Sequence, residues 1–164
     1  MGSAAFPFLA ALESIGAAQY VRESTWAYPT LETLHVMAIA LVVGSIWIVD
    51  LRILGLLLQR RSIESVMNEM LPVTWIVFAL ALITGALMFM SSAIMFADNP
   101  AFRIKVIVLA LAGVNVLFFH THAMKQWQVV GGHAVASPAM KVSGGASIIL
   151  WVSTIAAGRW IGFL

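Results

Sequence analysis

The chain has 164 residues, of which 62% are hydrophobic and only 10% are charged. A soluble globular domain carries about 25% charged residues, so this composition excludes an ordinary soluble domain and predicts an integral membrane protein. The absence of cysteine excludes disulfides, thiolate metal sites and c-type haem attachment. A net charge of +2 gives no reason to expect a nucleic-acid partner.

Residues 7–22 are expected to form a short helix lying in the membrane interface. Pro7 suits the first position of a helix, and Phe8, Leu12 and Ile15 follow at helical spacing. A flap packed over the end of a helix bundle is an equal alternative. The segment lacks the basic start and unbroken apolar run of a cleavable signal peptide.

Four longer apolar stretches predict membrane-spanning helices, because about 20 apolar residues cross a bilayer. The boundaries are expected near 29–58, 72–96, 101–126 and 140–163. A polar linker at 62–71, which could include one or two helical turns, a tight loop at 97–100 and a longer loop at 131–138 would join them. The prediction is an all-α bundle of four transmembrane helices with an N-terminal interfacial helix, in one domain over 1–164.

The distribution of basic residues predicts the orientation of this bundle. Arg60, Arg61, Lys125 and Lys141 gather at the end that holds the 62–71 linker. Basic loops favour the cytoplasmic side, so the slight bias places both termini on the other side. We therefore expect a multi-pass protein of a bacterial inner membrane with periplasmic termini.

The first span carries ionisable groups that a purely lipid-facing helix would not hold. An Asp or Arg near a span's centre costs about 2.5–3.5 kcal/mol on insertion scales, so such groups are functional candidates. Glu32 and His35 are three apart and share a helix face. For Asp50 and Arg52 we expect an interhelical salt bridge at the cytoplasmic boundary; a proton site beside a quinone or a contact to the third span are alternatives.

Helix geometry at 1.5 Å per residue sorts the polar groups into two layers. The layer toward the termini contains Glu32, His35, Lys105, Arg159 and the methionines Met88, Met90 and Met95. The opposite layer contains Asp50, Arg52, His120, His122 and Lys125. His35 and His120 therefore lie at different depths, and a single haem ligated by this pair would require large helix offsets.

The third span offers two histidines, of which only one can face the bundle squarely. Asn115 and His122 are seven residues apart and aligned, whereas His120 points about 160° away from His122. Because Asn115 is costly against lipid, it should face inward, which favours His122. Lys105 is closer in direction to His120, so both histidines stay candidates.

His35 is the main candidate ligand, since neutral imidazole binds haem iron and other metals. Arg159 and Lys105 lie where cations pair with haem propionates, and Met88, Met90 and Met95 offer thioethers for copper(I) or a sixth haem position. Each residue also has a plainer interpretation. His35 would hydrogen-bond Glu32 or a neighbouring span, the cations would anchor their helix ends in headgroups, and the methionines would fill apolar space.

The chain resembles a bacterial family of uncharacterised four-span inner-membrane proteins over nearly its whole length. The matching residues are Arg22 to Ser24, Trp26 to Pro29, Glu32, His35, Gly44, Asp50 to Arg52, Asn99 to Lys105, Asn115, Gly158 and Arg159. The Asp50-Leu51-Arg52 run is the most specific part. The layout is also similar to copper-resistance membrane proteins and four-helix b-type cytochromes, but paired histidines at matching depths are missing.

No nucleophile–base pair, phosphate loop or zinc motif is present, so we do not expect a hydrolase or a transferase. The leading expectation is a haem b membrane protein in electron transfer, because bundle interiors hold such cofactors. His35 would be one axial ligand, and a methionine of the second span or a histidine of the third would be the other. The alternatives are a copper transporter or chaperone, and a non-catalytic subunit. Besides the bilayer, the candidate partners are a redox protein, a larger membrane complex or a second copy of the chain.

Overall fold

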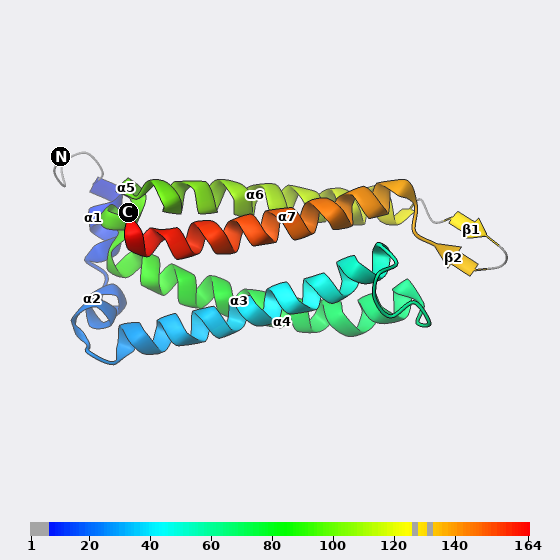
Figure 1. Cartoon of the computed structure of the whole chain (residues 1–164). Helices are drawn as coiled ribbons and strands as arrows, with labels where there is room; N and C mark the ends of the chain where they lie inside the picture. Colours follow the sequence, from blue (N-terminus) through cyan, green and yellow to red (C-terminus); the bar gives the residue numbers. More distant parts are fainter. Residues whose placement is uncertain (1–6, 126–127, 131–132) are drawn as a thin grey trace.

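The computed structural model describes residues 7–125, 128–130 and 133–164. Its four long helices are α3 (Ala27–Ile53), α4 (Ile63–Ser91), α6 (Pro100–Thr121) and α7 (Pro138–Trp160). Each of these stretches is long and apolar enough to cross a membrane, and they run along a common direction (Figure 1). The prediction of an all-α bundle with four membrane-spanning helices is confirmed.

Short elements occupy the two ends of the bundle (Figure 1). At one end, beside the C-terminus, lie α1 (Pro7–Glu13), α2 (Gly16–Glu23), α5 (Ala93–Asp98) and the 3-10 turn η2 (Ile161–Phe163). At the other end lie the α3–α4 loop, the 3-10 turn η1 (Ala123–Lys125) and an antiparallel hairpin of β1 (Gln128–Val130) and β2 (His133–Val135). This second end is called the loop end below. The hairpin lies where we expected a loop to begin.

The N-terminal segment forms two helices instead of the single helix expected over 7–22. Ile15 takes an extended conformation with ψ of 134°, and the Ser14 hydroxyl donates 2.7 Å to the Ala11 carbonyl, closing the end of α1. The first helix packs against α4 and α5, and the second against α3 and α4. The segment therefore covers the bundle end as a flap, while Phe8 and Tyr20 stay exposed at its surface.

The first long helix ends at Ile53, not at 58 as the apolar run suggested. Gly55 has a φ of +77°, in the left-handed region that favours glycine, and the Leu56 amide donates to the Leu51 carbonyl across the turn. The leucines that follow are exposed. The expected boundary was wrong because the apolar run continues past the residue that stops the helix.

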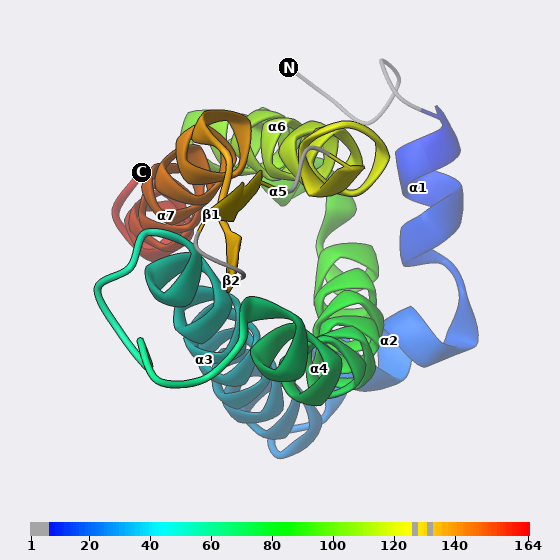
Figure 2. The same ribbon diagram turned by 90° about the vertical axis from the view of Figure 1, so that its right-hand side faces the viewer.

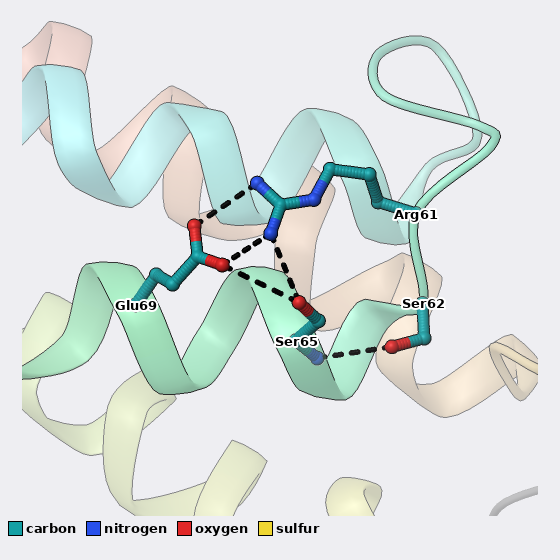
Figure 3. Close-up of polar contacts among 4 residues, drawn as sticks. All are labelled: Arg61, Ser62, Ser65 and Glu69. Carbon is teal, nitrogen blue, oxygen red and sulfur yellow. Dashed lines mark hydrogen bonds and ion pairs between the residues drawn. The ribbon is translucent and has the colours of Figure 1, made fainter.

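The second long helix starts nine residues earlier than expected. The Ser62 hydroxyl caps it by accepting from the Ser65 amide at 3.1 Å. Arg61, just before the helix, pairs with the Glu69 carboxylate and donates 3.0 Å to the Ser65 hydroxyl. Figure 3 shows this cluster joining the α3–α4 loop to the first turns of α4. The Ser62 cap and the Arg61–Glu69 ion pair therefore mark the start of α4.

The residues of 62–71 therefore belong to a helix and not to a polar linker. Ile63, Val66 and Met67 are buried in the core at the loop end. They recur at helical spacing, but the polar residues between them interrupt the apolar run. A search for continuous apolar runs therefore misses the first turns of this helix, because they are amphipathic.

The remaining boundaries differ less. A break at Ser92, with φ −150° and ψ 50°, ends α4 and separates off α5 inside the segment predicted as the end of span two. The Asn99 side chain caps α6 by accepting from the Ala101 and Phe102 amides, as a tight loop before Pro100 requires. The sixth helix ends at Thr121 and the seventh runs over Pro138–Trp160.

The four long helices do not pack equally against one another. The helix α3 packs against α4 and α7, and α7 packs against α6. The helices α4 and α6 meet near the terminal end, where the Phe89 ring stacks on the Phe102 ring with centroids 5.3 Å apart. At the loop end Figure 2 shows them apart, so the bundle is open between α4 and α6 at that end.

Candidate functional site

A cavity of about 240 Å³ lies between the four long helices, toward the loop end. Its wall is mostly apolar and includes the aromatic side chains Trp75, Phe78, Phe119 and Trp151. An engineered cavity of about 150 Å³ is large enough to bind benzene. The space here therefore suits an aromatic ring with a few further atoms.

The cavity lies toward the end of the bundle where α4 and α6 stand apart. Residues of both helices line it. Trp75, one of the lining residues, is 55% exposed. Since α4 is long and apolar enough to cross a membrane, the exposed side of Trp75 is positioned to face lipid.

Asp50 of α3 is the acidic residue in the cavity wall. It is only 7% exposed, and its Oδ2 atom has no hydrogen-bond partner in the described part of the chain. The approach of α7 is close here: a Cβ at Gly144 would lie 3.7 Å from Asp50 Oδ1, and Ser147 is within reach of the carboxyl group. A buried carboxyl oxygen without a partner is costly, so its retention points to a ligand.

The salt bridge expected for Asp50 and Arg52 is wrong. Arg52 Nε donates 2.7 Å to the Arg61 carbonyl, and no salt bridge to Asp50 occurs within the described ranges. The two residues point about 200° apart on α3, and within the described ranges no charged side chain of another helix lies within salt-bridge distance of either. Arg52 therefore closes the α3–α4 loop, whereas Asp50 faces the interior.

Asn115 fixes one wall of the cavity. Its Nδ2 donates 3.0 Å to the Ser143 carbonyl, and its Oδ1 accepts from the Ser143 hydroxyl at 3.0 Å. Both polar atoms of this amide are thus satisfied between α6 and α7. The arrangement ties the two helices together through both polar atoms of the amide.

His120, and not His122, lines the cavity. His120 Nδ1 lies 2.9 Å from the Val116 carbonyl, which only accepts, so Nδ1 carries the proton and Nε2 presents its lone pair. His122 is exposed, bonds the Thr121 hydroxyl and stacks on Phe118. The preference for His122, argued from its alignment with Asn115, is therefore wrong.

His35 lies about four turns from Asp50 along α3 and outside the cavity lining. Its Nδ1 is 3.0 Å from the Thr84 hydroxyl, which donates its single proton to the Leu80 carbonyl at 2.8 Å. The hydroxyl therefore accepts from His35 Nδ1–H, and Nε2 keeps a lone pair. A Cβ at Gly85 would come within 2.8 Å of the ring, so glycine permits this close approach.

The two cations predicted near His35 behave differently. Lys105 lies close enough to act on the charge of His35, and its Nζ would be 3.6 Å from a Cβ at Gly158 of α7. Arg159 is exposed and its guanidinium lies over the Phe163 ring, 4.9 Å from the centroid. The structure thus brings Lys105, but not the Arg159 guanidinium, into the interior near His35.

The other predicted site residues of this layer differ in exposure. Glu32 is exposed, Met88 and Met90 are partly buried, and Met95 is 61% exposed. Within the described ranges, no group of three or more His, Asp or Glu side chains is placed to hold a metal ion. The partner of His35 is Thr84, which the sequence reasoning did not name.

Thr74, Gly144 and Ser147 are further residues that the sequence reasoning missed. Thr74 and Ser147 line the cavity, and Gly144 adjoins Asp50. A signal for them exists, because small residues spaced by three or four on a span mark a close helix contact. Ser143, Gly144 and Ser147 form such a pattern on α7.

Comparison with protein families matches residues 16–164 to the description "Family of unknown function (DUF6644)". The chain belongs to this family. The expected membership of an uncharacterised family is thereby confirmed. No curated protein and no solved structure matches the chain. Family membership assigns no residue a role, so the function is argued from the geometry.

Proposed function

We propose that this member of the family binds a small lipophilic molecule, which enters the Asp50 cavity from the bilayer. The observation that carries the proposal is the unpartnered oxygen of a buried carboxyl group in an apolar cavity of about 240 Å³. Ionisable groups inside a membrane are expensive and mark functional sites. Ligand sites typically combine an apolar wall with a few convergent polar groups.

The arrangement gives each part of the cavity a distinct role. Asp50 on α3 and His120 on α6 present polar atoms to one end of a ligand. The aromatic side chains Trp75 and Trp151 contact its apolar body. The bonds between Asn115 and Ser143 hold α6 against α7, so the wall is preformed. The open side between α4 and α6 is the entrance.

Filling the cavity from within tests this proposal. Gly113 lines the cavity, and a Cβ added there meets nothing within 4 Å, so the Gly113→Phe variant places a ring in the binding space. Gly44 of α3 also has room for a Cβ but does not line the cavity, and Gly44→Phe is the matched control.

The measurement is ¹⁹F NMR of 4-fluorobenzyltrimethylammonium and of its uncharged carbon analogue, 1-fluoro-4-neopentylbenzene, with protein in detergent micelles. We expect a saturable shift for at least one probe with the unmodified protein and with Gly44→Phe, and its loss with Gly113→Phe. Shifts that are the same in all three proteins would overturn the proposal.

A second candidate is haem b binding and electron transfer at His35. The observation that favours it is the anchored imidazole, because metal-ligating histidines commonly donate their other ring N–H to a fixed acceptor. Lys105 in the same interior would pair with a propionate. The reduced-minus-oxidised spectrum of purified protein tests it, with His35→Ala expected to lose the bands and His122→Ala to keep them. Absence of a Soret band at stoichiometric protein removes this candidate.

The same purified protein also distinguishes the two remaining alternatives, copper handling and a non-catalytic subunit. Copper handling predicts bound metal after copper loading that is lost in His35→Ala. A non-catalytic subunit predicts a colourless, metal-free protein that purifies with a partner.

We also propose that the chain resides in the bacterial inner membrane with the loop end in the cytoplasm. Arg60 and Arg61 lie in the α3–α4 loop, and Lys125 and Lys141 lie close to the hairpin at the same end. Basic residues concentrate in cytoplasmic loops.

A further inference from the structure

The ionisable groups around the cavity are one carboxyl group and one imidazole. Among the lining residues, α3 contributes Asp50 and α6 contributes His120, whereas those of α4 and α7 include no ionisable side chain. Arg52, the nearest basic residue in sequence, is turned toward the Arg61 carbonyl. The wall therefore holds a carboxyl group and no Lys or Arg to neutralise it.

A charged ligand fits this imbalance better than a neutral one. A carboxylate taken out of water loses several kcal/mol of solvation, and a nearby opposite charge offsets that loss in a low-dielectric interior. With a neutral ligand, Asp50 would have to be protonated to avoid an uncompensated buried charge. Asp50 Oδ2, buried and without a partner in the described residues, is the atom left for a cation to meet.

The rest of the wall also suits a cation. Trp75, Phe78, Phe119 and Trp151 line the cavity, and the faces of aromatic rings attract cations. His120 has its Nδ1 proton committed to the Val116 carbonyl, so its Nε2 lone pair accepts from a donor or contacts a positive charge.

Resting on the proposed function above, we propose that the ligand is a small aromatic ammonium ion whose positive end pairs with Asp50. Its ring lies among the aromatic side chains, and its cationic end lies between α3 and α7, beside Gly144. The volume of about 240 Å³ fits one ring with a short charged arm. The ion enters and leaves sideways, between α4 and α6.

The pair of probes named above also tests the charge requirement, because the two differ only in a nitrogen cation against a carbon. We expect the cation to bind the unmodified protein more than about tenfold more tightly than its carbon analogue. Asp50→Asn should abolish that preference. Glu64→Gln is the matched control, since Glu64 is an exposed carboxylate in the first turn of α4 at the same end, and it should leave the preference intact.

Each result has a distinct meaning. If both probes bind equally and Gly113→Phe abolishes the binding of both, the proposed ligand binding stands and the preference for a cationic ligand is contradicted. Equal binding of the cation to the unmodified protein and to Asp50→Asn would overturn it as well. If neither probe binds, the proposed function and this inference fall together. If Asp50→Asn does not fold, the preference measured in the unmodified protein decides.

Discussion

The hydrogen bond between His35 and Thr84 joins two membrane-spanning helices through single side chains. Thr84 is buried, and its hydroxyl also bonds the Leu80 carbonyl of its own helix. Replacing it with valine keeps the shape of the side chain and removes both the acceptor of His35 Nδ1–H and the bond to the Leu80 carbonyl.

We expect Thr84→Val to lower the free energy of unfolding by about 1 kcal/mol, as hydrogen bonds between spans typically contribute. The measurement is unfolding in mixed micelles followed by circular dichroism. Thr33→Val is the control, because the Thr33 hydroxyl bonds only the Pro29 carbonyl of its own helix, at 2.8 Å. Equal losses in the two variants would show that the bond to His35 contributes nothing.

The helix face on which a side chain lies could be predicted from the sequence only where the helix is regular. Glu32 and His35 share a regular turn, yet the partner of His35 lies on α4, which periodicity cannot identify. His122 follows the last residue of α6, with φ −122° and ψ −58°, so an angle extrapolated along the helix fails there. His120 still lies within the helix and faces the cavity.

At the scale of elements, Gly85 sets how closely α4 approaches α3. A Cβ at this position would lie 2.8 Å from His35 Cε1, closer than atoms in contact tolerate. We expect Gly85→Ala to lower the unfolding free energy by about 1–3 kcal/mol, the usual cost of overpacking, in the same micelle assay.

Gly44→Ala and Gly145→Ala are controls for Gly85→Ala, since an added Cβ meets nothing within 4 Å at either position. Both should be neutral, or stabilising by up to about 1 kcal/mol through helix propensity. A loss in Gly85→Ala no larger than in these controls would mean that the α3–α4 contact is not limited by this residue.

The flap is held to the bundle end by Glu13. Its carboxylate accepts from the Ile94 amide at the start of α5, at 2.9 Å, and lies 3.8 Å from Arg22 Nη1. We expect Glu13→Ala to accelerate hydrogen–deuterium exchange in α1 and at the start of α5, measured by mass spectrometry. Glu23→Ala, at an exposed position on α2, should not change it. Unaltered exchange in Glu13→Ala would mean that apolar packing alone holds the flap.

Elements with strong local signals were predictable, and elements defined by their neighbours were not. Asn99 and Pro100 mark the start of α6 correctly, because capping is a local property. The end of α3 at Ile53 depends on the left-handed Gly55, and the early start of α4 depends on burial against other helices. An apolar run signals neither.

For the whole molecule, the proposed orientation gives a direct labelling test. The chain contains no cysteine, so a single introduced thiol reports its own location. Arg60 in the α3–α4 loop and Gln19 on α2 are both exposed and lie at opposite ends. A membrane-impermeant maleimide added to intact cells with a permeable outer membrane should label Gln19→Cys, and should label Arg60→Cys only after the inner membrane is opened. The reverse pattern would invert the orientation.

The four spans follow from composition, since long apolar helices are the stable way to cross a bilayer in a chain of this kind. The cavity does not follow, because it depends on α4 and α6 standing apart. Asp50 and Asn115 were singled out as polar residues in apolar spans, but only the structure separates the satisfied amide from the unpartnered carboxyl oxygen.

In the proposed function, the separation of α4 and α6 at the loop end also decides which concentration governs occupancy. A molecule leaving the cavity through this side returns to the leaflet, where acyl chains compete for the same apolar walls. Saturation should therefore follow the ratio of ligand to phospholipid and not the amount dissolved in the buffer. Adding empty vesicles to loaded proteoliposomes at a fixed total amount of ligand would then lower the occupancy of the cavity without any change in the protein.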